Sequence, residues 1–391
     1  MSRMLALPLV VLGLFALSCV AQEAPGPRIV DLTAADGTKL KATYFGAGKP
    51  APGVLLLHQC NQQRKNWDGL AARLAASGIN VLTLDYRGYG ESGGTRVKEL
   101  AQADFAKILA EKWPGDIDIA FNYLVSQPGV TRGTVGAGGA SCGVNQAIQV
   151  ARRHPEVRSL VLLSGTTDRE GRGFLRKSET LPVLLAAADD DDGAVELMQW
   201  MYGLSANPGS KFAHYSSGGH GTEMFAVYKE LPGMIVDWYV QTLAKTPGSA
   251  PAANAAGSAS RGPGILELID SPGGTTKAAE QLAEARQHNP KANLFSEAIV
   301  NVLGYEHLES GDTKGAVEIL KLNAIAYPAS PNVYDSLSDA YLADGQKDAA
   351  RENATKALQL LASDTTDPEA RRKLIQESAE AKLKQLGGAP Q

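Results

Sequence analysis

The chain has 391 residues, of which 44% are hydrophobic and 20% are charged, and its formal net charge is −4. This composition is typical of a folded globular protein, and the length predicts two domains. Charges of both signs are interspersed without a basic stripe, which argues against nucleic-acid binding. Three cysteines are too few for a disulfide scaffold.

The first 21 residues read MSRMLALPLVVLGLFALSCVA, with one arginine, an apolar run over residues 5–17 and small residues at the end. This layout predicts a secretory signal peptide over residues 1–21 that is cut after Ala21. The apolar run is short for a membrane-spanning helix. The alternatives are a lipoprotein attached through Cys19 and an uncleaved anchor. We therefore expect an exported protein, periplasmic or secreted, without a membrane span after signal removal.

The region from residue 28 to residue 245 alternates between strand and helix patterns. It opens with a predicted hairpin, 28–33 and 39–44, around Asp36-Gly37. Apolar or β-branched runs then predict strands at 53–57, 79–86, 134–138, 157–163, 181–188 and 211–215. Helical periodicity predicts helices at 67–76, 114–124, 144–151, 195–202 and 224–243, the last divided at Pro232-Gly233. This alternation predicts an α/β fold, a doubly wound and mostly parallel sheet.

Two stretches of this region carry no predicted element. A long polar connection precedes Pro114, and residues 166–180 are polar and short. The second stretch leaves little room for a lid domain, so we expect a site that is open or covered only by a loop.

The composition changes to Pro, Gly, Ser and Ala at 246–264, which predicts a flexible linker. Beyond it, residues 265–388 are predicted to be helical, and similar residues recur 34 positions apart: Gly311 and Gly345, Ala316 and Ala350. This period resembles that of tetratricopeptide repeats, with units at about 297–330 and 331–364. Helices at 275–289 and 369–386 are expected to cap the stack. The alternative is an ordinary helical bundle.

The stretch 134–153 contains a small-residue strand, a turn of the pattern Gly-x-Ser-x-Gly centred on Ser141, and a helix. In this context the serine occupies a strained turn and is presented to a ligand. Gly139 and Gly143 are needed where a side chain would collide with the neighbouring strand and helix. The helix directs its N-terminal N–H groups toward the place where an oxyanion forms. We predict that Ser141 is a nucleophile.

A serine nucleophile needs a base, and the base needs an acid that fixes its tautomer. Among six histidines, only His220 lies in a Gly-Gly-His-Gly loop after the last predicted strand. The acid is expected from the four aspartates at 189–192, with Asp191 preferred and Asp190 as the alternative. Asp189 or Asp192 is a candidate cap of the following helix. A calcium site is a rival for the acidic run, although adjacent aspartates lack the spaced ligands of known loops.

The order serine, aspartate, histidine, with the Gly-x-Ser-x-Gly turn and the Asp-x-Arg-Gly-x-Gly-x-Ser run at 85–92, resembles the α/β-hydrolase superfamily over residues 28–245. The compact core looks most like the dienelactone hydrolase-like branch. That branch commonly has a cysteine nucleophile, whereas here Cys142 follows the serine. The resemblance implies an oxyanion hole formed by the backbone N–H of Cys142 and that of Gln59 or Cys60.

The side chain of Gln59 stands where the family often has glycine, and it could either donate to the oxyanion or narrow the acyl pocket. If Cys60 and Cys142 both flank the oxyanion hole, their Cα atoms come within disulfide range. The alternative is two buried thiols that fill space.

We therefore expect an exported serine hydrolase with a tetratricopeptide tail and no cofactor or metal. It would act on a small ester-type substrate, a carboxylic ester or lactone, with thioesters open. Two rivals are a binding or scaffold protein whose repeats recruit a protein partner, and a serine peptidase of related fold.

Overall fold

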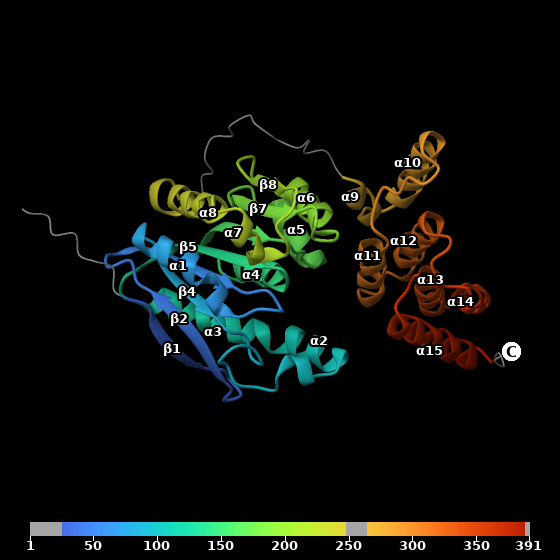
Figure 1. Cartoon of the computed structure of the whole chain (residues 1–391), viewed down its shortest axis with the longest axis horizontal. Helices are drawn as coiled ribbons and strands as arrows, with labels where there is room; N and C mark the ends of the chain where they lie inside the picture. Colours follow the sequence, from blue (N-terminus) through green and yellow to red (C-terminus); the bar gives the residue numbers. More distant parts are fainter. Residues whose placement is uncertain (1–25, 248–263, 388–391) are drawn as a thin grey trace, which may run out of the picture.

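The computed structural model describes residues 26–247 and 264–387; the predicted signal peptide and most of the predicted linker lie outside these ranges. Figure 1 shows two parts, a twisted sheet flanked by helices and a stack of helices beside it. Within the described ranges, no helix is long and apolar enough to cross a bilayer.

The described strands form one eight-stranded sheet in the order β1-β2-β4-β3-β5-β6-β7-β8. β1 and β2 pair antiparallel with their neighbours, whereas β3 to β8 run parallel to one another. The strands are β1 (Arg28–Thr33), β2 (Lys39–Phe45), β3 (Ala51–Leu57), β4 (Asn80–Leu84), β5 (Val130–Ala140), β6 (Val157–Leu163), β7 (Val183–Ala188) and β8 (Lys211–Tyr215). This topology confirms the predicted mostly parallel sheet.

The central strands are apolar on both faces because helices cover both faces. In β3, Leu55 and Leu57 belong to the hydrophobic cluster on one face, and Val54 and Leu56 to that on the other. The helices packed on the first face include α3 (Trp113–Ser126), α4 (Cys142–Arg153), α5 (Arg169–Lys177) and α6 (Ala194–Leu204). The second face is covered by α1 (Asp68–Ala76), α7 (Met224–Val227), α8 (Leu231–Tyr239) and a π-helix over Val240–Lys245.

The second part of the chain consists of helices in antiparallel pairs. They are α9 (Ile265–Asp270), α10 (Gly274–His288), α11 (Glu297–Glu309), α12 (Thr313–Ala326), α13 (Pro331–Ala343), α14 (Lys347–Leu361) and α15 (Glu369–Gln385). The pair α11 and α12 is followed by the pair α13 and α14, each helix starting 34 residues after its counterpart. Gly311 and Gly345 end equivalent helices with φ of 81° and 79°. The helix bounds thus follow the period that the sequence predicts.

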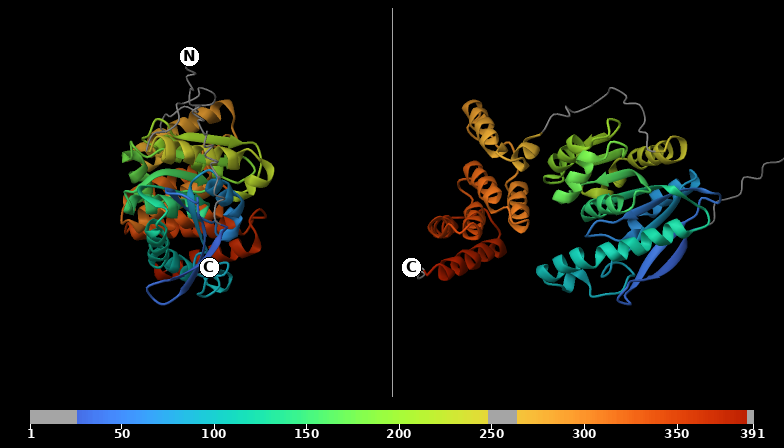
Figure 2. Two further views of the ribbon diagram at one scale, coloured as in Figure 1. Left: turned by 90° about the vertical axis from the view of Figure 1, so that its left-hand side faces the viewer. Right: turned by 180° about the vertical axis from the view of Figure 1, so that it is seen from behind.

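The two parts of the chain share a hydrophobic core. One cluster of buried side chains contains Met198 and Trp200 of α6 together with Ile269 of α9 and Ile299 of α11. Figures 1 and 2 show α9 and α11 as the helices nearest to the sheet-containing part. The helical region is therefore packed on the first part, next to α5 and α6.

Three local predictions were wrong. The polar connection before Pro114 contains α2 (Gln102–Glu111), whose residues are all at least partly exposed. Its apolar side chains Phe105, Ile108 and Leu109 are only partly buried. Residues 166–180 contain α5, which begins at the cap residue Asp168. The break in the closing helices precedes α8, because Pro232 is tolerated in the first turn of a helix.

A buried ion pair connects the sheet to the loop after β4. Arg64 and Asp85 are both fully buried and paired, and Arg64 also donates to Thr43 Oγ1 at 3.0 Å. The carboxylate of Asp85 accepts from the backbone N–H of Arg64 at 2.8 Å and that of Glu91 at 2.9 Å. Asp85 therefore fixes the turn that follows β4.

We expect the substitution Arg64→Ala to lower the free energy of unfolding by about 3–5 kcal/mol, because it leaves the buried Asp85 carboxylate without its cation. Urea denaturation monitored by circular dichroism measures this change. Lys65→Ala is the matched control: Lys65 is half exposed and pairs with Glu91 at 3.1 Å, so its loss should change stability by less than about 1 kcal/mol. Equal effects of the two substitutions would contradict the role given to Arg64.

Candidate active site

Ser141 lies between β5 and α4 in a backbone conformation that non-glycine residues rarely adopt. Its φ is 53° and its ψ is −121°. The Ser141 N–H donates to the carbonyl of Leu163 at 2.8 Å, which fixes the turn to the end of β6. Strain of this kind, about 1–3 kcal/mol, persists where the surrounding structure imposes it.

The two glycines of the turn are required by the close approach of strand and helix. A Cβ at Gly139 would lie 1.9 Å from the carbonyl oxygen of Gly143, and a Cβ at Gly143 would lie 2.4 Å from the carbonyl oxygen of Leu57. Both distances are far below van der Waals contact, and both contacts are with backbone. The reason given for these glycines from the sequence is thus confirmed.

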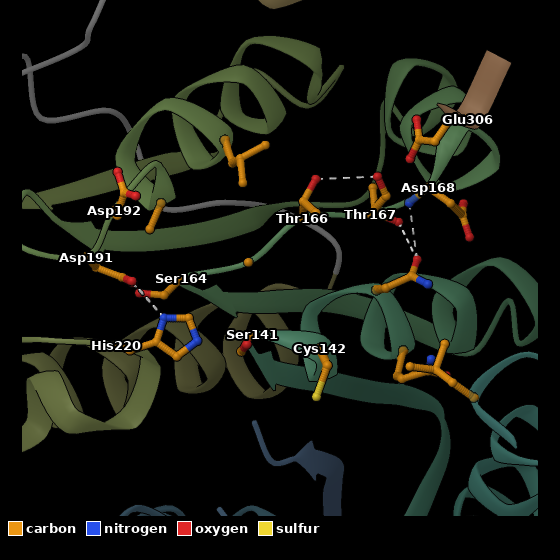
Figure 3. A pocket seen from close by; sticks show the side chains of 16 residues that line it. Ser141, Cys142, Ser164, Thr166, Thr167, Asp168, Asp191, Asp192, His220 and Glu306 are labelled. Carbon is orange, nitrogen blue, oxygen red and sulfur yellow. Dashed lines mark hydrogen bonds and ion pairs between the residues drawn. The ribbon is translucent and has the colours of Figure 1, made fainter. Parts of the chain in front are cut away.

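His220 follows β8 in a loop and is paired with Asp191, which follows β7. Nδ1 of His220 lies 2.8 Å from both carboxylate oxygens of Asp191. Since Asp191 accepts the Nδ1 proton, Nε2 is left as the proton acceptor of the neutral ring. Ser141, Asp191 and His220 line one cavity, and Figure 3 shows the ring between the other two side chains.

Each of the four consecutive aspartates has a different environment. Asp189 pairs with His214 at 2.7 Å, and Asp190 accepts from the backbone N–H groups of Gly218 and Gly219, both at 3.0 Å. These two hydrogen bonds lower the pKa of Asp190. Asp192 is exposed at the cavity. None of the four caps α6, because the cap position is taken by Gly193.

The backbone N–H of Cys142 is placed as the sequence suggests for an oxyanion donor. Cys142 is the first residue of α4, so its N–H has no partner within the helix. The positive end of the helix dipole lies at the same point. Together these features make the start of α4 suitable for stabilising a negative oxygen.

The side chain of Gln59 points toward the histidine loop. Its Oε1 accepts from the N–H and hydroxyl of Thr222 at 2.9 and 3.0 Å, and its Nε2 donates to the His220 carbonyl at 3.2 Å. Gln59 is fully buried and, like Cys60, is absent from the cavity lining. Gln59 therefore braces the loop that carries His220.

His58 stabilises the strand ends beneath the site. Burial lowers the pKa of His58 to about 4, so the ring is neutral at pH 7. Its Nδ1 donates to the Gln59 carbonyl at 2.7 Å, while its Nε2 accepts from the N–H of Tyr86 at 3.3 Å. His58 is thus engaged on both ring nitrogens.

Cys60 and Cys142 form a disulfide, with their Cα atoms 5.8 Å apart and a sequence separation of 82 residues. The bond links the loop after β3 to the first residue of α4. Both anchor points belong to the region in which the sequence places the oxyanion hole.

The cavity has a volume of about 440 Å³ and is lined by residues from both parts of the chain. The sequence gives no indication of two of them, Ser164 and Glu306. Ser164 follows β6 with φ of 47°, is 1% exposed, and its hydroxyl has no hydrogen-bond partner within residues 26–247 and 264–387. Glu306 belongs to α11, so part of the cavity lining comes from the helical region, whereas the sequence led us to expect a site that is open or covered only by a loop. The only local signal for Ser164 is its place at a strand end, before Gly165.

We expect Gly139→Ala to prevent stable folding or to lower the free energy of unfolding by about 4 kcal/mol or more, since the added methyl meets a backbone oxygen. Gly69→Ala is the matched control: Gly69 lies in α1 with no atom within 4 Å of an added Cβ. Because alanine favours helix, the control should keep or raise stability by up to about 1 kcal/mol. Thermal and urea unfolding of both variants tests this. A Gly139→Ala variant as stable as the unaltered chain would contradict the packing.

Reduction of the disulfide should lower stability. A cross-link closing a loop of this length is worth up to about 4.5 kcal/mol in the chain-entropy description. We expect dithiothreitol to lower the melting temperature of the chain and to have no effect on Cys60→Ser/Cys142→Ser. Thiol titration of the unreduced, unfolded protein should find neither Cys60 nor Cys142 free; two free thiols would rule out the bond.

The chain is similar to one known family and to several solved structures. Residues 48–192 match the family described as serine aminopeptidase, S33. Similar solved structures include an esterase of Pyrococcus furiosus, with 18% identity, 56% of this chain and 93% of that chain covered and a TM-score of 0.44. A predicted hydrolase of Thermoplasma acidophilum is 20% identical, with 56% of this chain and 99% of that chain covered and a TM-score of 0.42. The thioesterase domain of the curacin biosynthetic pathway is 14% identical, with 55% of this chain and 100% of that chain covered and a TM-score of 0.41.

The matched segment runs from the start of β3 to the turn that carries Asp191 and Asp192, and it includes Ser141. Together with the strand order and the strained serine turn, the family match supports an α/β-hydrolase fold for the N-terminal part of the chain.

Proposed function

We propose that the protein is a serine hydrolase that cleaves carboxylic esters or lactones through an acyl-enzyme, with Ser141 as nucleophile, His220 as base and Asp191 as the residue that orients His220. The observation that carries the proposal is the 2.8 Å pairing of His220 Nδ1 with Asp191 in a cavity that also exposes Ser141. No cofactor is needed for this chemistry.

In the first half of the reaction, the Ser141 hydroxyl attacks the substrate carbonyl while Nε2 of His220 takes its proton. The positive charge that forms on the ring is stabilised by Asp191. The negative oxygen of the tetrahedral intermediate accepts a hydrogen bond from the N–H of Cys142, with a second donor proposed from the Gln59–Cys60 backbone. His220 then gives the proton to the leaving alcohol.

In the second half, water attacks the acyl-serine and His220 again takes and returns the proton. The carboxylic acid product leaves with its own negative charge. Thioesters fit the same sequence of steps, because only the leaving atom differs.

A serine peptidase is the second candidate, because the family that matches residues 48–192 is described as a serine aminopeptidase. The same nucleophile and base would serve amide cleavage. Ester and aminoacyl-amide substrates assayed side by side separate the two candidates.

A binding role for the helical region stays a proposal of another class. Helix pairs with a 34-residue period are typical of tetratricopeptide repeats, which bind peptide segments. We propose that the protein is exported whichever role it has, because an exported protein reaches a compartment in which a disulfide such as Cys60–Cys142 is stable.

A fluorophosphonate probe tests the proposed function. We expect one adduct, mapped by mass spectrometry to Ser141 and absent from Ser141→Ala. Asp191→Asn should lower kcat/KM for p-nitrophenyl esters by about 10³–10⁴-fold, because the amide holds the wrong tautomer of His220.

Asp190→Asn is the matched control, since its amide oxygen can still accept from one of the two glycine N–H groups, which donate to separate carboxylate oxygens of Asp190; we expect less than about a tenfold loss. A folded protein without an adduct would contradict the proposed function. Equal losses for Asp190→Asn and Asp191→Asn would contradict the role of Asp191.

A further inference from the structure

We infer that the helical region is part of the catalytic unit, and that Glu306 of α11 determines specificity by disfavouring substrates with a negative charge at its end of the cavity. This inference rests on the proposed function and names the substrate class of the same site. It follows from how the helical region is attached, from the charges at the cavity and from an unpaired polar group inside it.

The helical region contacts the turn that carries Asp191. The nearest atom to a Cβ built on Gly193 is Cδ1 of Ile299 in α11, at 3.3 Å. The N–H of Ser296, which precedes α11, donates to Glu196 Oε2 at 3.3 Å. The helical region therefore packs on the start of α6, which begins three residues after Asp191.

A buried arginine holds Glu306 at the cavity. Arg172 of α5 is 1% exposed, and its Nη2 donates to Glu306 Oε2 at 2.6 Å. Its Nη1 donates to the Thr167 carbonyl at 2.9 Å, and the guanidinium lies 4.6 Å from the Trp200 ring centroid. Because Thr167 lines the cavity next to Glu306, one cation fixes both the cavity loop and the helix that faces it.

Arg172 does not cancel the negative charge of this region. Asp270 of α9 lies 3.5 Å from the same guanidinium nitrogen. The second arginine, Arg176, pairs with Glu267 at 2.6 Å and with Asp270 at 3.4 Å. Two arginines thus form ion pairs with three carboxylates.

The cavity wall itself is acidic. Besides the proposed catalytic Asp191 and His220, its charged residues among the described part of the chain are Asp168, Asp192 and Glu306, with no lysine or arginine. A carboxylate entering this space meets like charge, which Arg172 compensates in part at Glu306.

Ser164 indicates that the space receives a polar ligand group. Ser164 is among the lining residues, and Figure 3 shows its side chain next to the Asp191–His220 pair; the hydroxyl is buried and has no hydrogen-bond partner among the described residues. A buried hydroxyl without a partner is unfavourable unless a ligand or water satisfies it. A neutral group such as a carbonyl or hydroxyl can do so without facing the repulsion that a carboxylate meets.

Two pairs of isosteric esters test the inference on the full chain. In the first, p-nitrophenyl hexanoate is compared with p-nitrophenyl monoadipate, so that a carboxylate replaces the terminal methyl of the acyl group. In the second, propyl butyrate is compared with the butyrate ester of 3-hydroxypropionate, which places the charge on the alcohol side. The readout is the ratio of kcat/KM for the neutral and the anionic member.

We expect the unaltered chain to favour the neutral member of at least one pair, and Glu306→Gln to reduce that ratio by about tenfold. Glu306→Asp keeps the charge and should stay close to the unaltered ratio. Glu309→Gln is the matched control, because Glu309 is exposed on the same helix and outside the cavity lining.

An unchanged ratio for both pairs in Glu306→Gln would overturn the inference while leaving the proposed function standing. The same shift in Glu309→Gln would also overturn it, because a distant surface charge would then be the cause of the effect. If Glu306→Gln does not fold, the inference is tested with Glu306→Asp and with the salt dependence of the unaltered chain. The ratio of kcat/KM for the neutral and the anionic ester should fall as ionic strength rises, because salt screens the charge. A ratio that does not change with ionic strength would overturn the inference. A folded chain that hydrolyses neither neutral ester would overturn the proposed function and this inference with it.

Discussion

The candidate active site depends on how closely the end of β5 approaches the start of α4. The carbonyl oxygen of Gly143 occupies the volume that a side chain at Gly139 would need. A Cβ at Gly165, just after β6, would likewise lie 2.4 Å from the Ser141 carbonyl oxygen. Ser141 is therefore enclosed by backbone on several sides, and its positive φ is imposed by the packing of the sheet. The hydroxyl keeps one position relative to the helix N-terminus because the backbone around it has no freedom to relax.

In the turn after β7, consecutive aspartates have different partners and different roles. Adjacent carboxylates repel one another, and this turn limits the repulsion by giving them separate partners: a histidine for Asp189, two backbone N–H groups for Asp190 and the His220 ring for Asp191. Asp190 thus holds the loop in which His220 lies, while Asp191 orients the ring itself. Gln59 braces the same loop from the opposite strand. The proposed base is therefore positioned from the ends of β3 and β7, which lie on opposite sides of the serine strand β5.

The sequence predicts the parts of the fold in which local pattern and burial coincide. The strands at 157–163 and 211–215 are predicted to the residue, because short runs of strand-favouring residues between turn residues are typical of strands in a parallel sheet. α2 and α5 were missed for opposite reasons: α2 buries too little, and α5 buries an arginine that no hydrophobic pattern reveals. The pairing of Asp191 with His220 follows from strand order. The place of Glu306 could not be predicted, because it depends on how two parts joined by a linker pack together.

The disulfide closes a covalent ring that contains β4, α2, α3 and β5. The most weakly packed helix of the hydrolase part, α2, lies on this ring and buries none of its residues fully. A single cut by a protease within α2 would therefore release no fragment, because both new ends stay tethered through Cys60 and Cys142. The nicked molecule would stay in one piece under oxidising conditions and separate into two pieces only when reduced. For a protein expected to be exported, the bond would keep the molecule in one piece after a cut in this helix, which buries none of its residues fully.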